Sequence, residues 1–373
     1  MWEWREPFDS LLWLAAGGIT GTLARMALVE LFSCYSTAAP GAGGCRSLDD
    51  GALFLVLAPN MCGCFIAGLL STPAAAGVAV DERYGLHALA ALPPTHRLQA
   101  LTRVHVGLRT GFCGALTTWA SWNQEMTARA LQGDWARALL GLLVGVQLSL
   151  TSFAVGQHVA AGLWHAHAHP RHRVAAHDVA AEPGGLTTLA GEPPPPPTLS
   201  HPPAAQLWSG DVAAAVVLAA AVSGCVAGLA QSSNTTAREV CLAALCGPFG
   251  VVVRWQLARW NGALRAAPWL PLGTLLANVA ACVFDAALAA GYVRTQLSRG
   301  AVWGGVLNAA LQAGIGGGLS TVSTAVVEAS LLFSIVGSRW RGYMYLLITL
   351  VFSYAPSLAI YGGATHARRV GSN

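Results

Sequence analysis

Nine apolar stretches, each long enough to cross a lipid bilayer as a helix, constrain this chain more than any other feature. A transmembrane helix needs about 20 consecutive apolar residues. The stretches are Leu11–Phe32, Ala52–Ser71, Val104–Met126, Ala138–Leu163, Val212–Ala230, Val240–Trp260, Leu272–Val293, Val302–Val336 and Gly342–Tyr361. Only 10% of the 373 residues are charged, against about a quarter in an ordinary soluble protein. The sequence therefore predicts an all-α integral membrane protein with nine transmembrane helices in a lipid bilayer.

Residues 164–208 differ in composition from the apolar stretches on either side. This segment contains histidines at 165, 167, 169, 172 and 177, followed by the proline run Pro193–Pro197. Polar, proline-rich segments stay solvated because they cannot bury enough apolar surface to fold. We expect a disordered linker here. A histidine metal site is the alternative, although no cysteine or carboxylate stands at ligand spacing.

Several sequence features occur twice in the same order, which indicates an internal duplication. The matched features are Gly18 with Gly247, Gly21 with Gly250, Arg25 with Arg254, Asn60 with Asn278, and the segment Gly111–Glu125 with Gly314–Glu328. The two long segments keep one constant offset of 203 residues. We therefore divide the chain into a first half, residues 1–163, and a second half, residues 233–373.

The fifth apolar stretch has no counterpart in either half. Five spans, an odd number, therefore precede the second half, so it enters the membrane from the opposite side and is inverted relative to the first half. We predict a connecting transmembrane helix at residues 209–232, between two inverted four-helix repeats. Inverted repeats bring their functional elements together near the bilayer midplane.

The third and eighth stretches combine glycines with Thr or Ser in mid-membrane, which favours a broken third helix in each repeat. The eighth stretch is also too long for one straight span, and its run Gly314–Gly318 predicts the break. Non-helical backbone at this depth must be buried in protein or line a cavity. Exposed carbonyls at a break suit a monovalent cation, and helix N-termini suit an anion. A simple flexible kink is the alternative.

Each half also carries an arginine and an asparagine at matching positions of its apolar stretches. Arg25 and Arg254 are either anchors that snorkel to the membrane surface or packed pathway residues, and their repetition favours the second interpretation. Asn60 and Asn278 either join helices by hydrogen bonds or present N–H donors to a passing anion. Their matching positions favour the donor role.

Two aromatic residues follow the break of the first half. Trp119 and Trp122 are three residues apart and so share one helix face, whereas the matching positions of the second half hold Val322 and Ala325. Aromatic rings have positive edges that can stabilise an anion. Packing, or a place in the interfacial aromatic belt, is the alternative.

The last apolar stretch carries a row of hydroxyl groups. Tyr345, Thr349 and Ser353 recur every four residues and therefore lie on one helical stripe. Such a stripe could pass an ion along by exchanging its hydration for hydroxyl contacts. The fourth stretch has only Gln147 and Thr151 at a comparable spacing, which makes a weaker track.

Together these motifs resemble those of the CrcB/Fluc fluoride channels, in particular their two-domain eukaryotic relatives, the FEX fluoride exporters. The resemblance rests on Gly17, Gly18, Gly21 and Arg25, on Asn60 and Gly63, and on the long stretch Gly111–Glu125. The second half carries the same elements in a more diverged form. The resemblance covers every span except the connecting one.

The resemblance implies specific roles for these residues. A structural sodium ion would be held between the breaks by backbone oxygens of Gly114, Thr117, Gly317 and Ser320. Fluoride pores would be lined by Asn60, Asn278, Trp119, Trp122, Tyr345, Thr349 and Ser353, with Arg25, Arg254, Glu125 and Glu328 as structural motif residues. Bacterial members are antiparallel dimers, so this chain is expected to act as a single-chain pseudo-dimer. Because the two halves differ at the aromatic and hydroxyl positions, we predict that one of two pores conducts.

The function that follows is a passive, fluoride-selective channel in the plasma membrane, which exports cytoplasmic fluoride and confers fluoride resistance. The alternative is a proton- or sodium-coupled transporter in which Asp285, Glu125 and Glu328 carry coupling protons. An enzyme is not expected, because the spans lack a nucleophile–base pair and a metal signature. The net charge of +4, without a dense basic run, gives no reason to expect a nucleic-acid partner.

Overall fold

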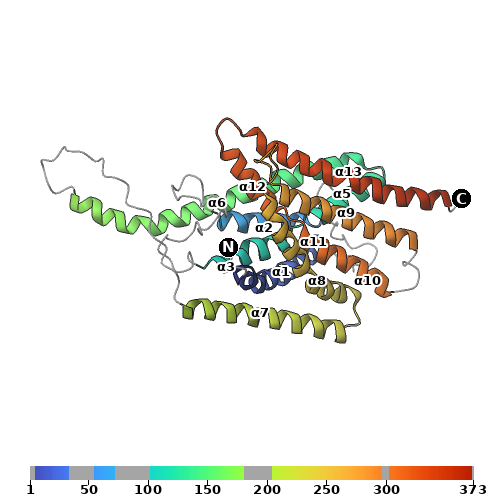
Figure 1. Ribbon diagram of the computed structural model, residues 1–373, viewed down its shortest axis with the longest axis horizontal. Helices are drawn as coiled ribbons and strands as arrows, with labels where there is room; N and C mark the ends of the chain where they lie inside the picture. The colour runs from blue at the N-terminus through green and yellow to red at the C-terminus, as the bar shows by residue number, and fades with distance from the viewer. Residues whose placement is uncertain (1–4, 33–53, 72–100, 180–203, 296–301, 372–373) are drawn as a thin grey trace, which may run out of the picture.

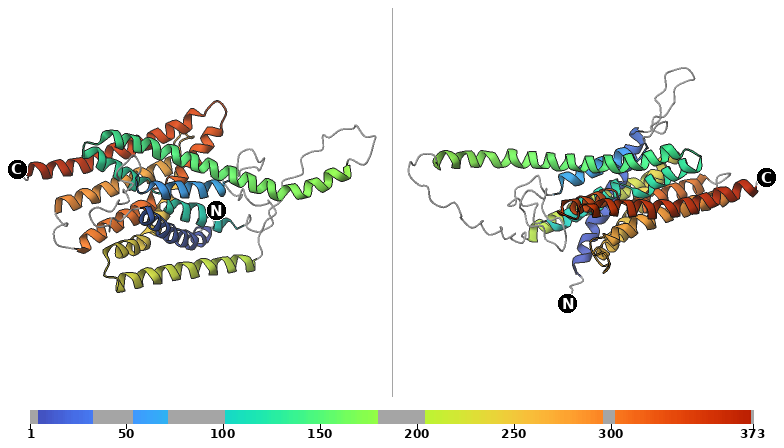
Figure 2. Two further views of the ribbon diagram at one scale, coloured as in Figure 1. Left: turned by 180° about the vertical axis from the view of Figure 1, so that it is seen from behind. Right: turned by 90° about the horizontal axis from the view of Figure 1, so that it is seen from above.

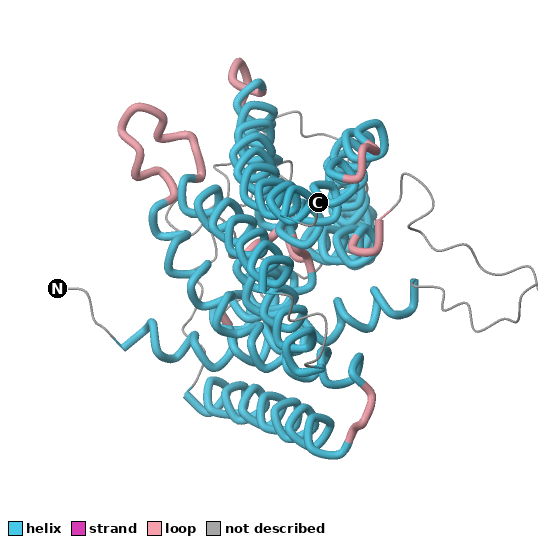
Figure 3. Tube along the Cα trace, turned by 90° about the vertical axis from the view of Figure 1, so that its right-hand side faces the viewer, coloured by secondary structure: helices cyan, strands magenta, loops and turns pink. Residues whose placement is uncertain are grey.

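The computed structural model describes residues 5–32, 54–71, 101–179, 204–295 and 302–371. Within these ranges the chain is helical and contains no β-strand (Figure 3). The first helices are α1 (Arg5–Phe32), α2 (Leu57–Leu69), α3 (Thr102–Val106), the π-helix η4 (Gly107–Cys113), α4 (Gly114–Leu116), α5 (Trp119–Leu131), α6 (Trp135–Val179) and α7 (Ala204–Gln231). The others are α8 (Thr235–Leu257), the 3-10 helix η5 (Ala258–Trp260), α9 (Leu272–Thr295), α10 (Val302–Leu311), the π-helix η7 (Gln312–Gly316), α11 (Gly317–Leu319), α12 (Ser323–Ser334) and α13 (Trp340–Gly371).

Seven helical segments of the described chain are long and apolar enough to cross a membrane. They are Ser10–Phe32, Trp135–Leu163, Gly210–Gln231, Thr235–Trp260, Leu272–Val293, Trp303–Ser334 and Trp340–Ala367. The second predicted span is represented by α2, which is apolar but has 13 residues. The third consists of the shorter pieces α3, η4, α4 and α5, which carry Arg109 and Glu125. The described chain is thus an all-helical, multi-pass membrane protein.

The two interrupted helices lie in the middle of the helix bundle (Figure 1). On one side α1 packs against η4, on the other α8 packs against η7, and α1 and α8 also pack against each other. Two further helix pairs flank this centre, α2 with α6 and α9 with α13. The connecting helix α7 lies at the edge of the bundle, where it packs chiefly against α1 and α8 (Figures 1 and 2).

Both interruptions fall at hydroxyl residues rather than at the glycines. The backbone of Thr117 (φ −95°, ψ 147°) and of Thr118 (φ −142°, ψ 124°) is extended, and so is that of Ser320 (φ −84°, ψ 160°). The prediction that the run Gly314–Gly318 forms the break is therefore wrong by a few residues. The run remains helical, first as a π-helix and then as α-helix. Its lack of side chains instead permits close contacts with neighbouring groups.

The predicted linker is partly helical. Helix α6 continues past its last membrane-spanning residue, Leu163, as far as Val179, and α7 begins at Ala204 (Figure 2). Adding a residue to an existing helix requires no new nucleation, so the His-containing segment after Leu163 can extend the preceding span. The disordered linker predicted for residues 164–208 is wrong over these two parts. Residues 180–203 lie outside the described part of the chain.

Candidate functional site

Arg25 of α1 reaches from the first half into the broken helix of the second. Its side chain is 1% exposed, and Nη1 donates a hydrogen bond to the carbonyl of Ala115 at 2.8 Å, while Nη2 donates to the carbonyl of Ala313. The guanidinium lies directly against Gly317, where any Cβ would overlap it. Arg25 is therefore packed inside the protein and does not snorkel to the surface.

Arg254 of α8 makes the reciprocal contacts. It is 2% exposed, and Nη2 donates to the carbonyl of Thr110 at 2.8 Å, while Nε donates to the carbonyl of Gly318 at 3.1 Å. Its guanidinium lies against Gly114, which again has no room for a Cβ. The four carbonyls contacted by the two arginines form two pairs separated by the offset of 203 residues found in the sequence. Each arginine thus ties the break of its own half to that of the other half.

The two asparagines brace the breaks. Asn60 Oδ1 accepts a hydrogen bond from the amide of Thr118 at 2.8 Å, and its Nδ2 donates to the carbonyl of the same residue at 3.2 Å. Asn278 does the same with Thr321, at 2.8 Å and 3.1 Å. Each side-chain amide therefore hydrogen-bonds both the N–H and the carbonyl of one residue at a break. An amide nitrogen carries two N–H groups, so one on each Nδ2 is left over within the part of the chain that the structure describes.

Hydroxyl groups are exchanged between the halves at the breaks. Ser320 Oγ accepts hydrogen bonds from the first two backbone amides of α5, at 3.1 and 3.0 Å. In return, Thr117 Oγ1 accepts from the amides of Val322 and Ser323 at 3.2 and 3.1 Å. Each half thereby caps the N-terminus of the other half's second helix segment. The expectation that these helix N-termini are open to an anion is wrong, because side-chain oxygens already occupy their amides.

Backbone carbonyls at the breaks are left without their helical donors. In a continuous helix the carbonyls of Gly114, Thr117, Gly317 and Ser320 would accept from the amides four residues later. Those amides, of Thr118, Ser121, Thr321 and Thr324, all donate to side-chain oxygens instead. The centre therefore combines free carbonyl oxygens with occupied amides. Oxygen ligands of this kind suit a hard cation.

The two tryptophans of α5 are both buried, but their indole N–H groups differ. Trp122 Nε1 donates to the carbonyl of Gly141 at 3.2 Å, and its ring stacks on Phe54 with centroids 5.8 Å apart. Trp119 packs edge-on against Trp122 at 5.1 Å. Its Nε1 has no hydrogen-bond partner among the described residues. Trp119 therefore retains an unused donor immediately after the first break.

The hydroxyl row of α13, which we call the second-half row, consists of Tyr345, Thr349 and Ser353. All three side chains are fully buried. Tyr345 donates its O–H to Glu328 Oε2 at 2.7 Å, and Thr349 donates to the carbonyl of Tyr345 at 2.8 Å. Glu328 also accepts at Oε1 from the hydroxyl of Thr274 at 2.6 Å. The row therefore begins at a carboxylate whose two oxygens are both hydrogen-bonded.

The glutamate of the first half has different surroundings. Glu125 pairs with Arg129 at 3.5 Å, one turn further along α5, and 21% of its side chain is exposed. The matching Glu328 instead takes hydrogen bonds from other helices and from Asn261 Nδ2 at 2.8 Å. The two matched glutamates therefore differ in their partners, since Glu125 forms an ion pair on its own helix and Glu328 accepts hydrogen bonds from other segments.

Equivalent positions on α6 form a first-half row of Gly141, Gly145 and Ser149. The register follows from the cysteine contacts, since Cys64 of α2 lies beside Ser149 and Cys282 of α9 lies beside Ser353. A Cβ at Gly145 would overlap the ring of Trp122, and a Cβ at Gly141 would overlap the sulfur of Met126. Large apolar side chains of α5 therefore fill the space over this row. The weaker track predicted from Gln147 and Thr151 is wrong, because both side chains are exposed on the outer face of α6.

Sequence reasoning missed Asn123, which joins the two halves. Its Nδ2 donates to Ser357 Oγ at 2.7 Å, and Ser357 donates to the carbonyl of Ser353 at 2.9 Å. Asn123 stands four residues after Trp119, and Ser357 four residues after Ser353. The helical period could therefore have revealed both residues. They extend the polar surface of the second-half row onto α5.

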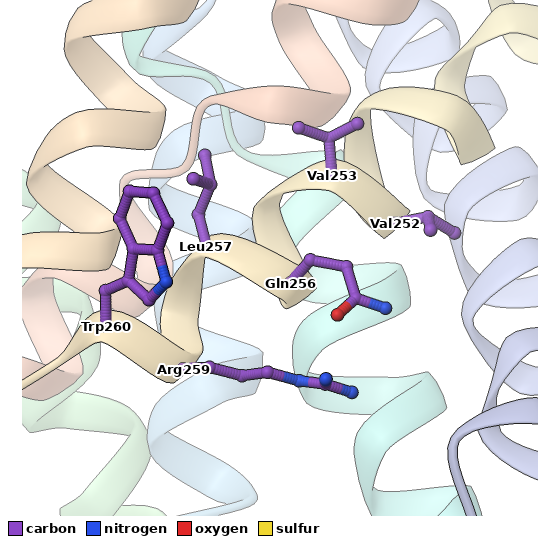
Figure 4. A pocket seen from close by; sticks show the side chains of 6 residues that line it. All are labelled: Val252, Val253, Gln256, Leu257, Arg259 and Trp260. Carbon is purple, nitrogen blue, oxygen red and sulfur yellow. The ribbon is translucent and has the colours of Figure 1, made fainter. Parts of the chain in front are cut away.

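A hollow on the outer face of α8, near its end, contains none of these residues (Figure 4). It is lined by Val252, Val253, Gln256, Leu257, Arg259 and Trp260. Arg259 lies over the ring of Trp255 at 4.9 Å. Because the hollow is separate from the breaks and from both rows, we assign it no part in the site.

Comparison with known proteins matches both halves of the chain to one family. The family model described as CrcB-like protein, Camphor Resistance (CrcB), matches residues 12–157 and again residues 241–363. A fluoride-specific ion channel FluC of Prosthecochloris aestuarii is 28% identical over 144 residues, which cover 38% of this chain and 87% of that protein. FluC of Cupriavidus metallidurans is 33% identical over 112 residues, covering 30% and 73%. FluC of Chlorobium phaeobacteroides is 28% identical over 148 residues, covering 39% and 90%. No solved structure matches the chain.

Proposed function

This chain belongs to the CrcB-like family, and from that premise we propose that it is a passive, fluoride-selective channel that exports cytoplasmic fluoride. The observation that carries the proposal is the pairing of a buried hydroxyl row with two broken helices that cap each other. Transport, not catalysis, is the function that such a buried polar surface within a membrane supports. The ion bound is the one named for the FluC relatives.

The chain is a single-chain pseudo-dimer of two inverted four-helix repeats with nine spans. Support comes from the contacts of Arg25 and Arg254, which are exchanged between halves at one offset. The exchanged caps of Thr117 and Ser320 have the same symmetry. The connecting helix α7 supplies the odd span that inverts the second repeat. Cysteine labelling of the two ends of α7 from opposite sides of the membrane tests this topology.

A structural sodium ion fits the centre between the breaks. Backbone oxygens of Gly114, Thr117, Gly317 and Ser320 would hold it, because each has lost its helical donor. When bound, the ion supplies a fixed positive charge that joins the two halves. We expect the melting temperature of the purified protein to be higher in sodium than in potassium, since a ligand that binds only the folded state stabilises it. Equal melting temperatures in the two salts would contradict this assignment.

Fluoride passes along the second-half row. Fluoride holds its water tightly, so a conducting path must replace that water with closely spaced N–H and O–H donors. Asn278 has one N–H left over among the described residues, and Ser353 adds a hydroxyl. The hydroxyls of Tyr345 and Thr349 would turn from their present acceptors, Glu328 and the carbonyl of Tyr345, to the ion. The first-half row offers two glycines covered by Trp122 and Met126. The halves are therefore specialised, and only the second-half row conducts.

Export follows from the chemistry of fluoride. It enters a cell as the weak acid HF and is stranded inside as the anion at neutral pH. In the plasma membrane a passive channel lets the inside-negative potential drive the anion out, at about 2.3 kcal/mol per 100 mV. Cells that lack the protein should therefore become sensitive to fluoride while keeping their tolerance of chloride.

The alternative is a proton- or sodium-coupled transporter, and the buried carboxyl group of Asp285 favours it. Reconstitution in liposomes separates the two functions. A channel releases fluoride when a potential is applied at equal pH on both sides, whereas a proton-coupled transporter needs a pH gradient. Chloride-loaded liposomes are the control. Chloride release as fast as fluoride release would show that the channel is not selective for fluoride.

The asparagines test the specialisation of the halves. Asn278→Asp places a carboxylate beside the second-half row, and Asn60→Asp does so beside the first-half row. Both variants lose one donor to a break carbonyl, so their stabilities should fall alike, by about 1–2 kcal/mol. Fluoride efflux should fall by two orders of magnitude or more in Asn278→Asp, as about 3 kcal/mol of charge repulsion implies, and far less in Asn60→Asp. An equal loss in both variants would mean that both pores conduct.

A further inference from the structure

Asp285 of α9 is a buried carboxylate with no donor. It is 1% exposed, and neither Oδ1 nor Oδ2 has a hydrogen-bond partner in the described part of the chain. Glu328 of the same half is also buried, yet its two oxygens accept from Tyr345, Thr274 and Asn261. Two carboxyl groups in one half therefore have opposite environments. An ionised carboxylate without donors is very costly in an apolar interior, and such a group takes up a proton instead.

The neighbours of Asp285 leave room for a neutral carboxyl group. Oδ1 lies against the Cα of Gly316 in η7, a segment without titratable residues. The charged group that acts on Asp285 is Arg25 of α1, and the other titratable neighbour is the thiol of Cys282 on α9. The two terminal nitrogens of Arg25 donate hydrogen bonds to carbonyls, one in each half. No ion pair within 4.0 Å joins Arg25 to Asp285 in the described chain. Its hydrogen bonds therefore do not serve this carboxyl group.

Asp285 also has a defined place beside the second-half row. It follows Asn278 by seven residues, which is two helical turns or about 10 Å along the same face of α9. Between them stands Cys282, beside Ser353 at the end of the row. The matching position of the first half, seven residues after Asn60, is Ala67. The extra polar group thus occurs only in the half whose row carries three hydroxyls.

We propose that Asp285 is held as a neutral carboxylic acid and donates its O–H to the permeating anion as the next contact after Ser353. A carboxylate at this position would repel an anion, whereas a carboxylic acid offers a strong donor. The acid also leaves the charge of Arg25 uncompensated by a carboxylate, which attracts the anion towards this end of the row. The proposal rests on the proposed function for the identity of the anion, but the protonation state can be tested without it.

Infrared difference spectroscopy tests the protonation state in the intact protein. Subtracting the spectrum of Asp285→Asn from that of the unmodified protein at neutral pH should reveal the carbonyl stretch of a neutral carboxylic acid. The matched control is Glu328→Gln recorded at alkaline pH, whose difference spectrum should show the bands of an ionised carboxylate, because hydroxyl and amide donors surround that group. An ionised-carboxylate band from Asp285 at neutral pH overturns the proposal. This result does not depend on whether the protein conducts.

Fluoride efflux from liposomes tests the donor role. Asp285→Asn keeps an N–H donor of similar shape and should retain efflux within about a factor of two, whereas Asp285→Ala removes the donor. Loss of a hydrogen bond to a charged group is expected to reduce efflux about 10- to 100-fold in Asp285→Ala. Equal losses in both variants would show that the negative charge matters, which contradicts the proposal. Unchanged efflux in both would show that the anion does not contact Asp285. Gel filtration and thermal unfolding of both variants separate these effects from misfolding.

The two proposals fail in different ways. If the unmodified protein releases no fluoride, the proposed function is wrong, and the infrared result still decides the state of Asp285. If the unmodified protein conducts and the neutral acid is absent, only the inference about Asp285 is wrong.

Discussion

The second-half row and the first-half row occupy equivalent positions on α13 and α6, but they differ in what they present. Tyr345 and Thr349 carry hydroxyl groups on α13, which packs against α12, and the positions of α12 that match Trp122 and Met126 hold Ala325 and Ala329. At the equivalent first-half positions, glycines lie under Trp122 and Met126. In the first half the large side chains therefore stand on the third helix of the repeat and the glycines on the fourth. In the second half the larger side chains stand on the fourth helix. One arrangement keeps a polar surface and the other fills it with apolar atoms.

The same set of contacts at the centre of the bundle, which we call the frame, can therefore support one row lined by hydroxyl groups and another covered by apolar side chains. The frame consists of the exchanged arginines, the braced breaks and the exchanged caps, and it is the same in both halves. These contacts hold backbone groups and do not depend on the rows. After a duplication, the rows could therefore change while the centre stayed fixed. Three predictions test this comparison.

The largest effect should come from moving the first-half packing into the second half. The double variant Ala325→Trp with Thr349→Gly copies the pair formed by Trp122 and Gly145. The indole should cover the second-half row, and we expect fluoride efflux from liposomes to fall by at least about 100-fold, the loss that two hydroxyl contacts of 1.5 kcal/mol would cause.

The reciprocal transplant is the matched control. Trp122→Ala with Gly145→Thr opens the first-half row and leaves the second untouched. Efflux should be unchanged or higher in this variant. If it falls as far as in the second-half transplant, the two rows are not different in function.

A smaller effect is expected from removing one hydroxyl of the row. Thr349→Val keeps the shape of the side chain but loses the O–H, so efflux should fall about 10-fold through the loss of one donor. Thr151→Val is the control, because Thr151 is exposed on the outer face of α6 and should not affect efflux. The same assay measures both, and a comparable drop in Thr151→Val would place the path on the other side of α6.

The smallest effect concerns stability alone. Trp122→Phe removes the N–H that donates to the carbonyl of Gly141, so the free energy of unfolding should fall by about 1 kcal/mol without a change in efflux. Trp119→Phe removes a donor that has no partner among the described residues and should not destabilise the protein in this way. Thermal unfolding in detergent compares the two. A larger stability loss in Trp119→Phe would refute the assignment of partners.

Much of the frame could be predicted from the sequence, because duplication repeats spacings. The matched glycines, Arg25, Arg254 and the two asparagines identified the elements that meet at the centre. The repeat could not tell which half a side chain would contact, so the exchange of the arginines and of the Thr117 and Ser320 caps was missed. That choice depends on how two helices cross, which no local pattern contains.

The errors have related causes. Glycine was expected to break the helix, but the glycines serve close packing, and the break falls where Thr117 and Ser320 exchange caps. Free helix N-termini were expected to attract an anion, yet capping side chains from the opposite half occupy them. A period of four residues could not tell the buried row of α13 from the exposed Gln147 and Thr151 of α6. Burial decides these cases, and burial is a property of the whole bundle.

Passive and selective conduction of fluoride can be measured as the reversal potential of the purified protein in a planar lipid bilayer. With unequal fluoride on the two sides, the current should reverse at the fluoride equilibrium potential, and a pH gradient should not move it. A reversal potential that follows the pH gradient, or one set by chloride, would show that the protein is not a passive fluoride channel.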